Sequence, residues 1–147
     1  MTSLGPFTMQ IIVPSLPAMA RDLDASIAII QLTITLYLAA VAAGQLIYGP
    51  LSDRFGRRPL LMGGIALYAA ASLAAALSEG VLGLVMARTL QAVGACAGVV
   101  LTRAVIRDVW PRDEAAGVLG YVGMGMTIAP MLSPLIGSLL EEAFDWR

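Results

Sequence analysis

The 147-residue chain has no histidine, no lysine and only one cysteine. These absences leave no histidine general base, no cysteine–histidine metal cluster and no phosphate-binding glycine loop followed by lysine. The lone Cys96 cannot form an intramolecular disulfide, and we interpret it as a small packing residue. The sequence therefore gives little support to an enzyme, and we expect no metal site and no cofactor.

Charge is also scarce. Only 13% of the residues are charged, whereas 59% are hydrophobic and the mean hydropathy is +0.83. Soluble domains carry charge on about a quarter of their residues. The net charge of −1 provides no basic surplus for nucleic acid, and no basic stretch precedes the first apolar segment, so we expect no cleavable signal peptide. This composition predicts an integral membrane protein.

Long apolar segments support the membrane class. A helix that crosses a hydrocarbon core of about 30 Å needs roughly 20 apolar residues. Four segments are about this long and contain no Asp or Glu: residues 27–48, 59–77, 81–102 and 115–140. A shorter segment, residues 4–19, precedes them. The sequence therefore predicts an all-α membrane protein with about five transmembrane helices.

The arginines are distributed unequally between the connections. One side of the membrane would carry six of them: Arg54, Arg57, Arg58, Arg103, Arg107 and Arg112. The other side would carry only Arg21 and Arg147. Because basic residues in short loops stay in the cytoplasm, we predict that residues 49–58 and 103–114 are cytoplasmic.

Residues 49–58 read Gly-Pro-Leu-Ser-Asp-Arg-Phe-Gly-Arg-Arg, and we call them the latch segment. Gly49 would let two backbones approach closely at a helix end, and Gly56 would permit a turn with positive φ. Asp53 can face arginines or the positive N-terminus of another helix. The remaining basic residues can pair with anionic lipid headgroups, and they are Arg54, Arg57 and Arg58. A simple positive-inside loop is the alternative.

The latch segment resembles the cytoplasmic loop motif of the major facilitator superfamily, G-x-L-[S/A]-D-R-x-G-R-[R/K]. The resemblance covers essentially the whole chain, which is similar to helices one to five of that twelve-helix fold. It implies that residues 1–147 form part of the amino-terminal half, an incomplete six-helix bundle. It also implies that Asp53 acts as a conformational latch against a carboxy-terminal half that is missing here. The implied partners are membrane lipid, protons and a small-molecule substrate, in the plasma membrane (bacterial inner membrane).

Arg88 lies seven residues into the third long segment, about 10 Å along a helix axis. An arginine at such depth is by default functional. Gln91 follows at i+3 on the same helix face, and Gly94 with Gly98 permits close helix packing. The stretch is similar to the family pattern R-x-x-Q-G-x-x-A, with Ala92 in place of the glycine. The resemblance implies that Arg88 takes part in proton coupling; the alternative is an arginine packed against carbonyls for structural reasons.

The last long segment contains two prolines on one helix face. Each removes a backbone hydrogen-bond donor and bends a helix. The pattern Ala-Pro-x-x-x-Pro-x-x-Gly is similar to the antiporter motif of the Bcr/CflA drug-resistance branch of this superfamily. Its residues here are Ala129, Pro130, Pro134 and Gly137. Residues 44–50 and 13–17 resemble the same branch, which consists of drug:proton antiporters.

One position departs from that branch. Its first helix usually carries an aspartate four residues before the first proline, where this chain has Gln10. A neutral amide cannot bind and release a proton as a carboxylate does. Either the proton-carrying acid would then lie in a part of the transporter that is missing here, or the coupling of transport to protons would work differently. Gln10 would instead hydrogen-bond substrate in a central cavity. Seven methionines could line an adaptable drug pocket, but we interpret them as ordinary residues of lipid-facing helices: Met9, Met19, Met62, Met86, Met124, Met126 and Met131.

The leading hypothesis is a secondary transporter that couples the proton gradient to efflux of drug-like small molecules by alternating access. Nucleic acid is not an expected partner. Two alternatives stay open. In the first, the chain would be a truncated, transport-inactive membrane fragment, because its five helices omit the sixth span and the second half of the transporter. Otherwise it would belong to a facilitator-type transporter of another substrate class.

Overall fold

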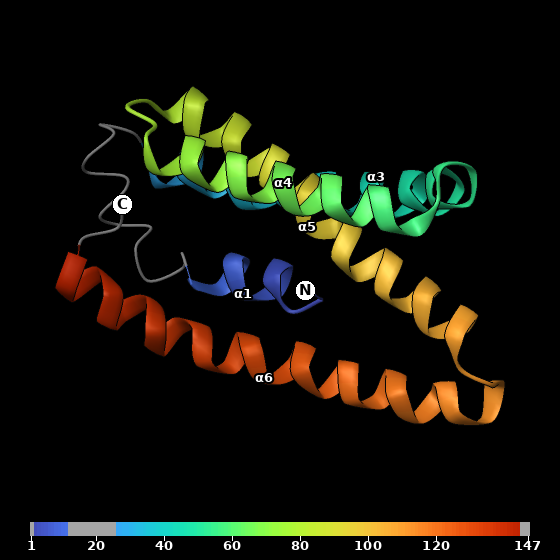
Figure 1. Cartoon of the computed structure of the whole chain (residues 1–147). Helices are drawn as coiled ribbons and strands as arrows, with labels where there is room; N and C mark the ends of the chain where they lie inside the picture. Colours follow the sequence, from blue (N-terminus) through green and yellow to red (C-terminus); the bar gives the residue numbers. More distant parts are fainter. Residues whose placement is uncertain (1, 12–25, 145–147) are drawn as a thin grey trace.

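The computed structural model describes residues 2–11 and 26–144, and the regular structure in these ranges is helical. The helices are α1 (Leu4–Ile11), α3 (Ile27–Phe55), α4 (Arg57–Ala76), α5 (Val81–Val109) and α6 (Arg112–Phe144) (Figure 1). The predicted all-α class is therefore confirmed.

Four of these helices are long and apolar enough to cross a membrane. The qualifying stretches are Gln31–Phe55, Arg57–Ala76, Val81–Val109 and Arg112–Leu139. Each of them overlaps one of the four long segments predicted from hydropathy, although the ends differ. Helix α1 contributes eight residues of the shorter predicted segment, and residues 12–19 of that segment lie outside the described residues.

The latch segment is not the open connection that its polarity suggests. Helix α3 continues to Phe55 and α4 begins at Arg57, so Gly56 alone separates the two helices. Gly56 has a φ of 87°, as its predicted role requires, and its N–H donates to the carbonyl of Ser52 at 3.0 Å. Hydropathy identifies only the part of a helix that suits hydrocarbon, whereas polar residues can extend the same helix into water. The predicted connection is thus wrong in length.

The predicted connection 103–114 is also mostly helical. Helix α5 runs to Val109 and α6 starts at Arg112, which leaves Trp110 and Pro111 between them. Proline disfavours helical backbone in the residue before it. Trp110 accordingly adopts an extended conformation, with φ −102° and ψ 142°. The turn therefore has a local cause in the sequence.

Helix α5 packs closely against α4 through glycine. A Cβ atom on Gly94 would lie 2.6 Å from the backbone nitrogen of Tyr68 and 2.7 Å from the carbonyl oxygen of Gly64. A Cβ atom on Gly64 would in turn collide with that of Ala97. The close approach predicted for Gly94 is confirmed. Helix α5 carries further small buried residues: Ala87, Ala92, Ala95, Cys96, Ala97 and Gly98.

Helix α6 runs apart from α3 and α4, meets α5 where the two helices are joined, and has α1 between it and the rest of the bundle (Figure 1). Pro130 and Pro134 lie inside α6 and do not end it. Gly137 is buried where α6 meets α1, because a Cβ atom there would overlap the carbonyl oxygen of Ile11. The last glycine of the antiporter-like pattern is thus a packing position between these helices.

The glycine contact predicts an asymmetry between two neighbouring positions of α4. Gly64→Ala should destabilise the bundle by about 1–3 kcal/mol, because the new methyl group would overlap Ala97. The matched control, Gly63→Ala, places the same methyl group where no atom lies within 4 Å. That control should be neutral or stabilising by up to about 1 kcal/mol through helix propensity. Unfolding by SDS in mixed micelles, followed by circular dichroism, measures both; equal stabilities would contradict the close contact.

Candidate functional site

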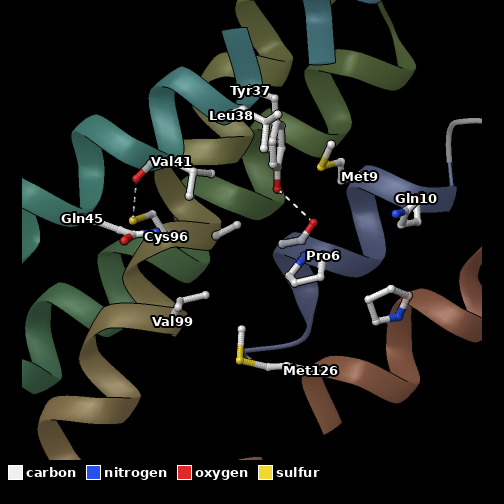
Figure 2. A pocket seen from close by; sticks show the side chains of 13 residues that line it. Pro6, Met9, Gln10, Tyr37, Leu38, Val41, Gln45, Cys96, Val99 and Met126 are labelled. Atoms are coloured by element: carbon white, nitrogen blue, oxygen red, sulfur yellow. Dashed lines mark hydrogen bonds between the residues drawn. The ribbon is translucent and has the colours of Figure 1, made fainter. Parts of the chain in front are cut away.

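A cavity of about 250 Å³ lies between α1, α3, α5 and α6 (Figure 2). Its wall is predominantly apolar, and Pro6, Leu38, Val41 and Val99 are among its lining residues. The polar side chains in the wall are Gln10, Tyr37 and Gln45. An apolar hollow with a few polar groups is the usual composition of a site for small organic molecules.

The polar groups of the cavity differ in whether they already form hydrogen bonds within the protein. The Tyr37 hydroxyl donates to the carbonyl of Gly5 at 3.3 Å, which joins α3 to α1. Within the described ranges, the side-chain amides of Gln10 and Gln45 have no hydrogen-bond partner. These two amides can therefore donate to and accept from a bound molecule.

The structure brings together two residues that the sequence singled out separately. Gln10 of α1 and Pro130 of α6 line the same cavity. Met9 and Met126 line it too, so the interpretation as ordinary lipid-facing residues is wrong for these two methionines, while Met19 lies outside the described residues. Ala129 and Pro134 are not among the lining residues, and Pro134 is exposed. The antiporter-like pattern thus reaches the cavity through its first proline.

Arg88 belongs to a separate polar network that crosses from α5 to α4. Its Nη1 donates to Oε1 of Gln91 at 2.8 Å, as the i+3 spacing predicts. Nε2 of Gln91 donates to the Ser72 hydroxyl at 2.7 Å, and that hydroxyl donates to the carbonyl of Tyr68 at 2.8 Å. The hydrogen-bond partner of Arg88 among the described residues is thus the side chain of Gln91, and its buried Nε has no partner among them.

The network extends to α1 through a tyrosine. The Tyr68 hydroxyl lies 2.6 Å from the hydroxyl of Thr8. A small cavity of about 10 Å³ beside Arg88 is lined by residues that include Thr8, Met9 and Tyr37. Because Met9 and Tyr37 also line the larger cavity, they form the partition between it and Arg88. Gln10 therefore lies on the larger cavity, and Arg88 lies behind its wall.

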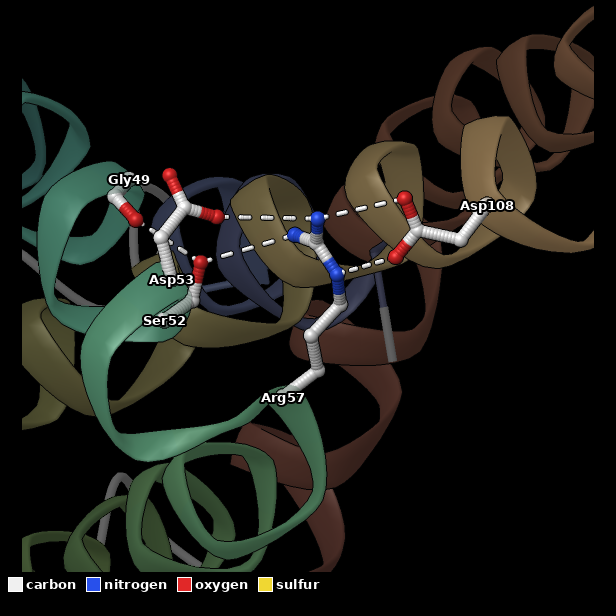
Figure 3. A network of polar contacts seen from close by, with 5 residues as sticks. All are labelled: Gly49, Ser52, Asp53, Arg57 and Asp108. Atoms are coloured by element: carbon white, nitrogen blue, oxygen red, sulfur yellow. Dashed lines mark hydrogen bonds and ion pairs between the residues drawn. The ribbon is translucent and has the colours of Figure 1, made fainter.

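Arg57 makes most of the polar contacts of the latch segment (Figure 3). Its Nε and Nη2 donate to the two carboxylate oxygens of Asp108 at the end of α5, with Nη2 and Oδ1 3.2 Å apart. Nη2 also lies 3.6 Å from Oδ1 of Asp53, and Nη1 donates to the Ser52 hydroxyl at 3.5 Å. The Ser52 hydroxyl donates to the carbonyl of Gly49 at 2.8 Å. One guanidinium thus connects the ends of three helices.

The other latch residues have weaker contacts. Arg54 and Arg58 are exposed, and the Arg54 guanidinium lies 5.4 Å from the centre of the Phe55 ring. The close backbone approach predicted at Gly49 does not occur within the described residues, because a Cβ atom there would meet nothing within 4 Å. Among the described residues, Gly49 instead contributes its carbonyl group, which accepts a hydrogen bond from the Ser52 hydroxyl.

Sequence reasoning missed several residues of these networks. Asp108 follows Arg107 in a predicted connection, and its pairing with Arg57 spans 51 positions. Tyr68 and Ser72 are polar residues four positions apart in an apolar segment, and this spacing could have indicated a polar contact inside the membrane. Gln45 offered the same signal in α3. Polar side chains inside long apolar segments thus identify the networks, although not their pairing.

The Arg57–Asp108 pair should contribute measurably but modestly to stability. The side chains are 28% and 50% exposed, and exposed ion pairs contribute about 0.2–1 kcal/mol. A double-mutant cycle with Arg57→Gln and Asp108→Asn, followed by SDS unfolding, should give a coupling energy in this range that falls as salt rises. Asp113→Asn is the matched control, because Asp113 is exposed and has no ion pair among the described residues. Additive effects of the Arg57 and Asp108 changes would contradict the pairing.

Comparison with known proteins places these features in a family. Residues 1–147 match the family model described as Major Facilitator Superfamily. A chloramphenicol resistance protein of Pseudomonas aeruginosa is 40% identical over 100% of this chain and 35% of its own length. Multidrug resistance protein D of Escherichia coli strain K12 is 33% identical over 100% of this chain and 37% of its own length.

A third relative is similar over the same extent. The bicyclomycin resistance protein homolog of Haemophilus influenzae is 32% identical over 100% of this chain and 37% of its own length. The chain therefore spans about a third of the length of the curated relatives it matches. The family match over residues 1–147 agrees with the latch segment and with the four membrane-crossing helices, and the chain belongs to the major facilitator superfamily of membrane transporters.

Proposed function

We propose that this chain is part of a secondary transporter that exports drug-like small molecules across a bacterial inner membrane in exchange for protons. The observation that carries the proposal is the apolar cavity with the amides of Gln10 and Gln45, which have no hydrogen-bond partner among the described residues. Its wall suits uncharged organic molecules with a few hydrogen-bonding groups. The names of three relatives, which refer to chloramphenicol, multidrug and bicyclomycin resistance, support the same substrate class.

The cavity is smaller than a complete substrate site. Ligand pockets usually measure about 300–1,000 Å³, and this one measures about 250 Å³. We therefore propose that residues from the rest of the transporter complete the site, which would place it between two halves that alternate in opening. Met9 and Met126 would adapt to substrates of different shape, because thioether side chains are flexible and polarisable.

Arg88 is the residue that we assign to proton coupling. A guanidinium does not release its proton in proteins, so Arg88 would act through its charge rather than carry a proton. Substrate that presses on Met9 and Tyr37 would change the surroundings of Arg88 across the shared partition. The proton carrier would then be an acid elsewhere in the complete transporter, since Gln10 cannot serve.

Asp53 and Arg57 would form the conformational latch on the cytoplasmic side. Asp53 is 71% exposed and only one of its oxygens lies near Arg57, so it remains available to a further partner. That partner would belong to the other half of the transporter. Opening and closing of this contact would bias the balance between inward-open and outward-open states.

Arg88 can be tested in the complete transporter, in inverted membrane vesicles that develop a proton gradient. Arg88→Ala should abolish proton-driven drug accumulation, while drug binding persists because the cavity wall is intact. Arg103→Gln is the control, since it removes an exposed arginine. Undiminished proton-driven transport by Arg88→Ala would refute the assignment. Transport that never depends on a proton gradient would favour the facilitator-type alternative.

The cytoplasmic position of the latch segment has its own test. In a Cys96→Ser background, Asp53→Cys should react with a membrane-impermeant thiol reagent in inverted vesicles and not in intact cells. A cysteine at Glu79, in the connection between α4 and α5, should show the reverse pattern. Labelling of the residue 53 cysteine in intact cells would invert the proposed topology.

A further inference from the structure

The corner between α5 and α6 contains a second, larger hollow. The two helices meet here at one end of the molecule (Figure 1), and the hollow measures about 490 Å³. Its lining residues are Arg107, Trp110, Arg112, Ala115, Ala116 and Leu119. One side is therefore basic and aromatic, and the other side is an apolar strip of α6.

The two arginines of this hollow form no ion pair with any described residue. Arg107 and Arg112 are exposed, and neither has an ion pair within the described part of the chain. The acid next to Arg107 is Asp108, which is already paired with Arg57. Asp113 and Glu114 lie in the first turn of α6 and do not line the hollow. The wall thus presents two positive charges and no acid.

The position of the hollow along the helices matches the headgroup layer of a bilayer. Arg107 lies five residues beyond the apolar segment that ends at residue 102, or about 7.5 Å along the helix. Trp110 is the type of residue enriched at membrane–water interfaces. The apolar strip continues from Ala116 to Leu119 into the membrane-crossing part of α6.

We propose that this corner binds a phospholipid with an anionic headgroup. Arg107 and Arg112 would contact the phosphate, because guanidinium groups match phosphate oxygens in charge and geometry. The acyl chain would lie along Ala116 and Leu119. This apolar strip favours a lipid over a free phosphate or an acidic peptide, which would use only the basic side of the hollow.

The bound lipid would lie beside the latch. Asp108 is adjacent to Arg107 in sequence and holds Arg57 at the ends of α3 and α4. Lipid charge at this corner would therefore act on the side of the protein where the helix ends are joined. The proposal requires no transport activity and does not depend on the identity of the substrate.

Trp110 provides a direct reporter. The chain has two tryptophans, so Trp146→Phe leaves Trp110 as the single one. We would reconstitute this variant of the 147-residue chain in phosphatidylcholine bilayers with a minor fraction of phosphatidylglycerol. Two preparations would differ only in which lipid carries brominated acyl chains, which quench tryptophan on contact. Brominated phosphatidylglycerol should quench Trp110 more than its mole fraction predicts, with a preference of roughly fivefold per arginine.

Substitutions test whether the preference for phosphatidylglycerol depends on the two arginines of the hollow. R107Q/R112Q should remove it, whereas R54Q/R58Q makes the same change of charge in the latch segment and should preserve it. R107K/R112K should retain part of it, because charge remains without the planar guanidinium. Circular dichroism would establish equal helix content in all variants, so that a loss of preference is not a loss of fold.

Three results would overturn the proposal. Quenching of the Trp146→Phe variant in proportion to mole fraction would leave Trp110 as an ordinary interfacial residue. Persistence of the preference in R107Q/R112Q, or its equal loss in R54Q/R58Q, would indicate a general charge effect. Displacement of the brominated lipid by inorganic phosphate at low millimolar concentration would identify a free-anion site in place of a lipid site.

Discussion

The close contact between α4 and α5 is the constraint on which the polar interior depends. Gly94 and Gly64 allow the two backbones to meet without side chains between them. Only at this separation can the Gln91 amide reach the Ser72 hydroxyl at 2.7 Å. A polar side chain in hydrocarbon has no water to satisfy it, so this short hydrogen bond gives Arg88 a fixed neighbour in Gln91. The two glycines thus determine the surroundings of Arg88.

Two tyrosine hydroxyls hold α1 against the other helices. Tyr68 extends from α4 to Thr8, and Tyr37 extends from α3 to the backbone of Gly5. Both hydroxyls therefore anchor α1, which in turn separates α6 from the other helices. The cavity exists because α1 is held at this place. A movement of α1 would alter the cavity and the polar network together.

Local sequence patterns predicted the features that depend on spacing along one helix. The four long spans follow from apolar length, and the Arg88–Gln91 hydrogen bond follows from an i+3 interval. The Asp108 partner of Arg57 and the Thr8 partner of Tyr68 lie 51 and 60 positions away, where single-chain periodicity carries no information. Helix ends were also missed at Gly56 and Trp110, because hydropathy reports the bilayer boundary rather than the end of the hydrogen-bonded backbone.

Gly56 gives the molecule a one-residue joint between two long helices. Helix α4 has 20 residues, and at 1.5 Å per residue it is about 30 Å long. A rotation of about 10° around this glycine would move the far end of α4 by about 5 Å, close to the helical pitch of about 5.4 Å. Arg57 follows the joint directly and is held by Asp108 on another helix. The joint and the ion pair that restrains it are therefore adjacent in sequence, so a small displacement at Arg57 corresponds to a large one at the far end of α4.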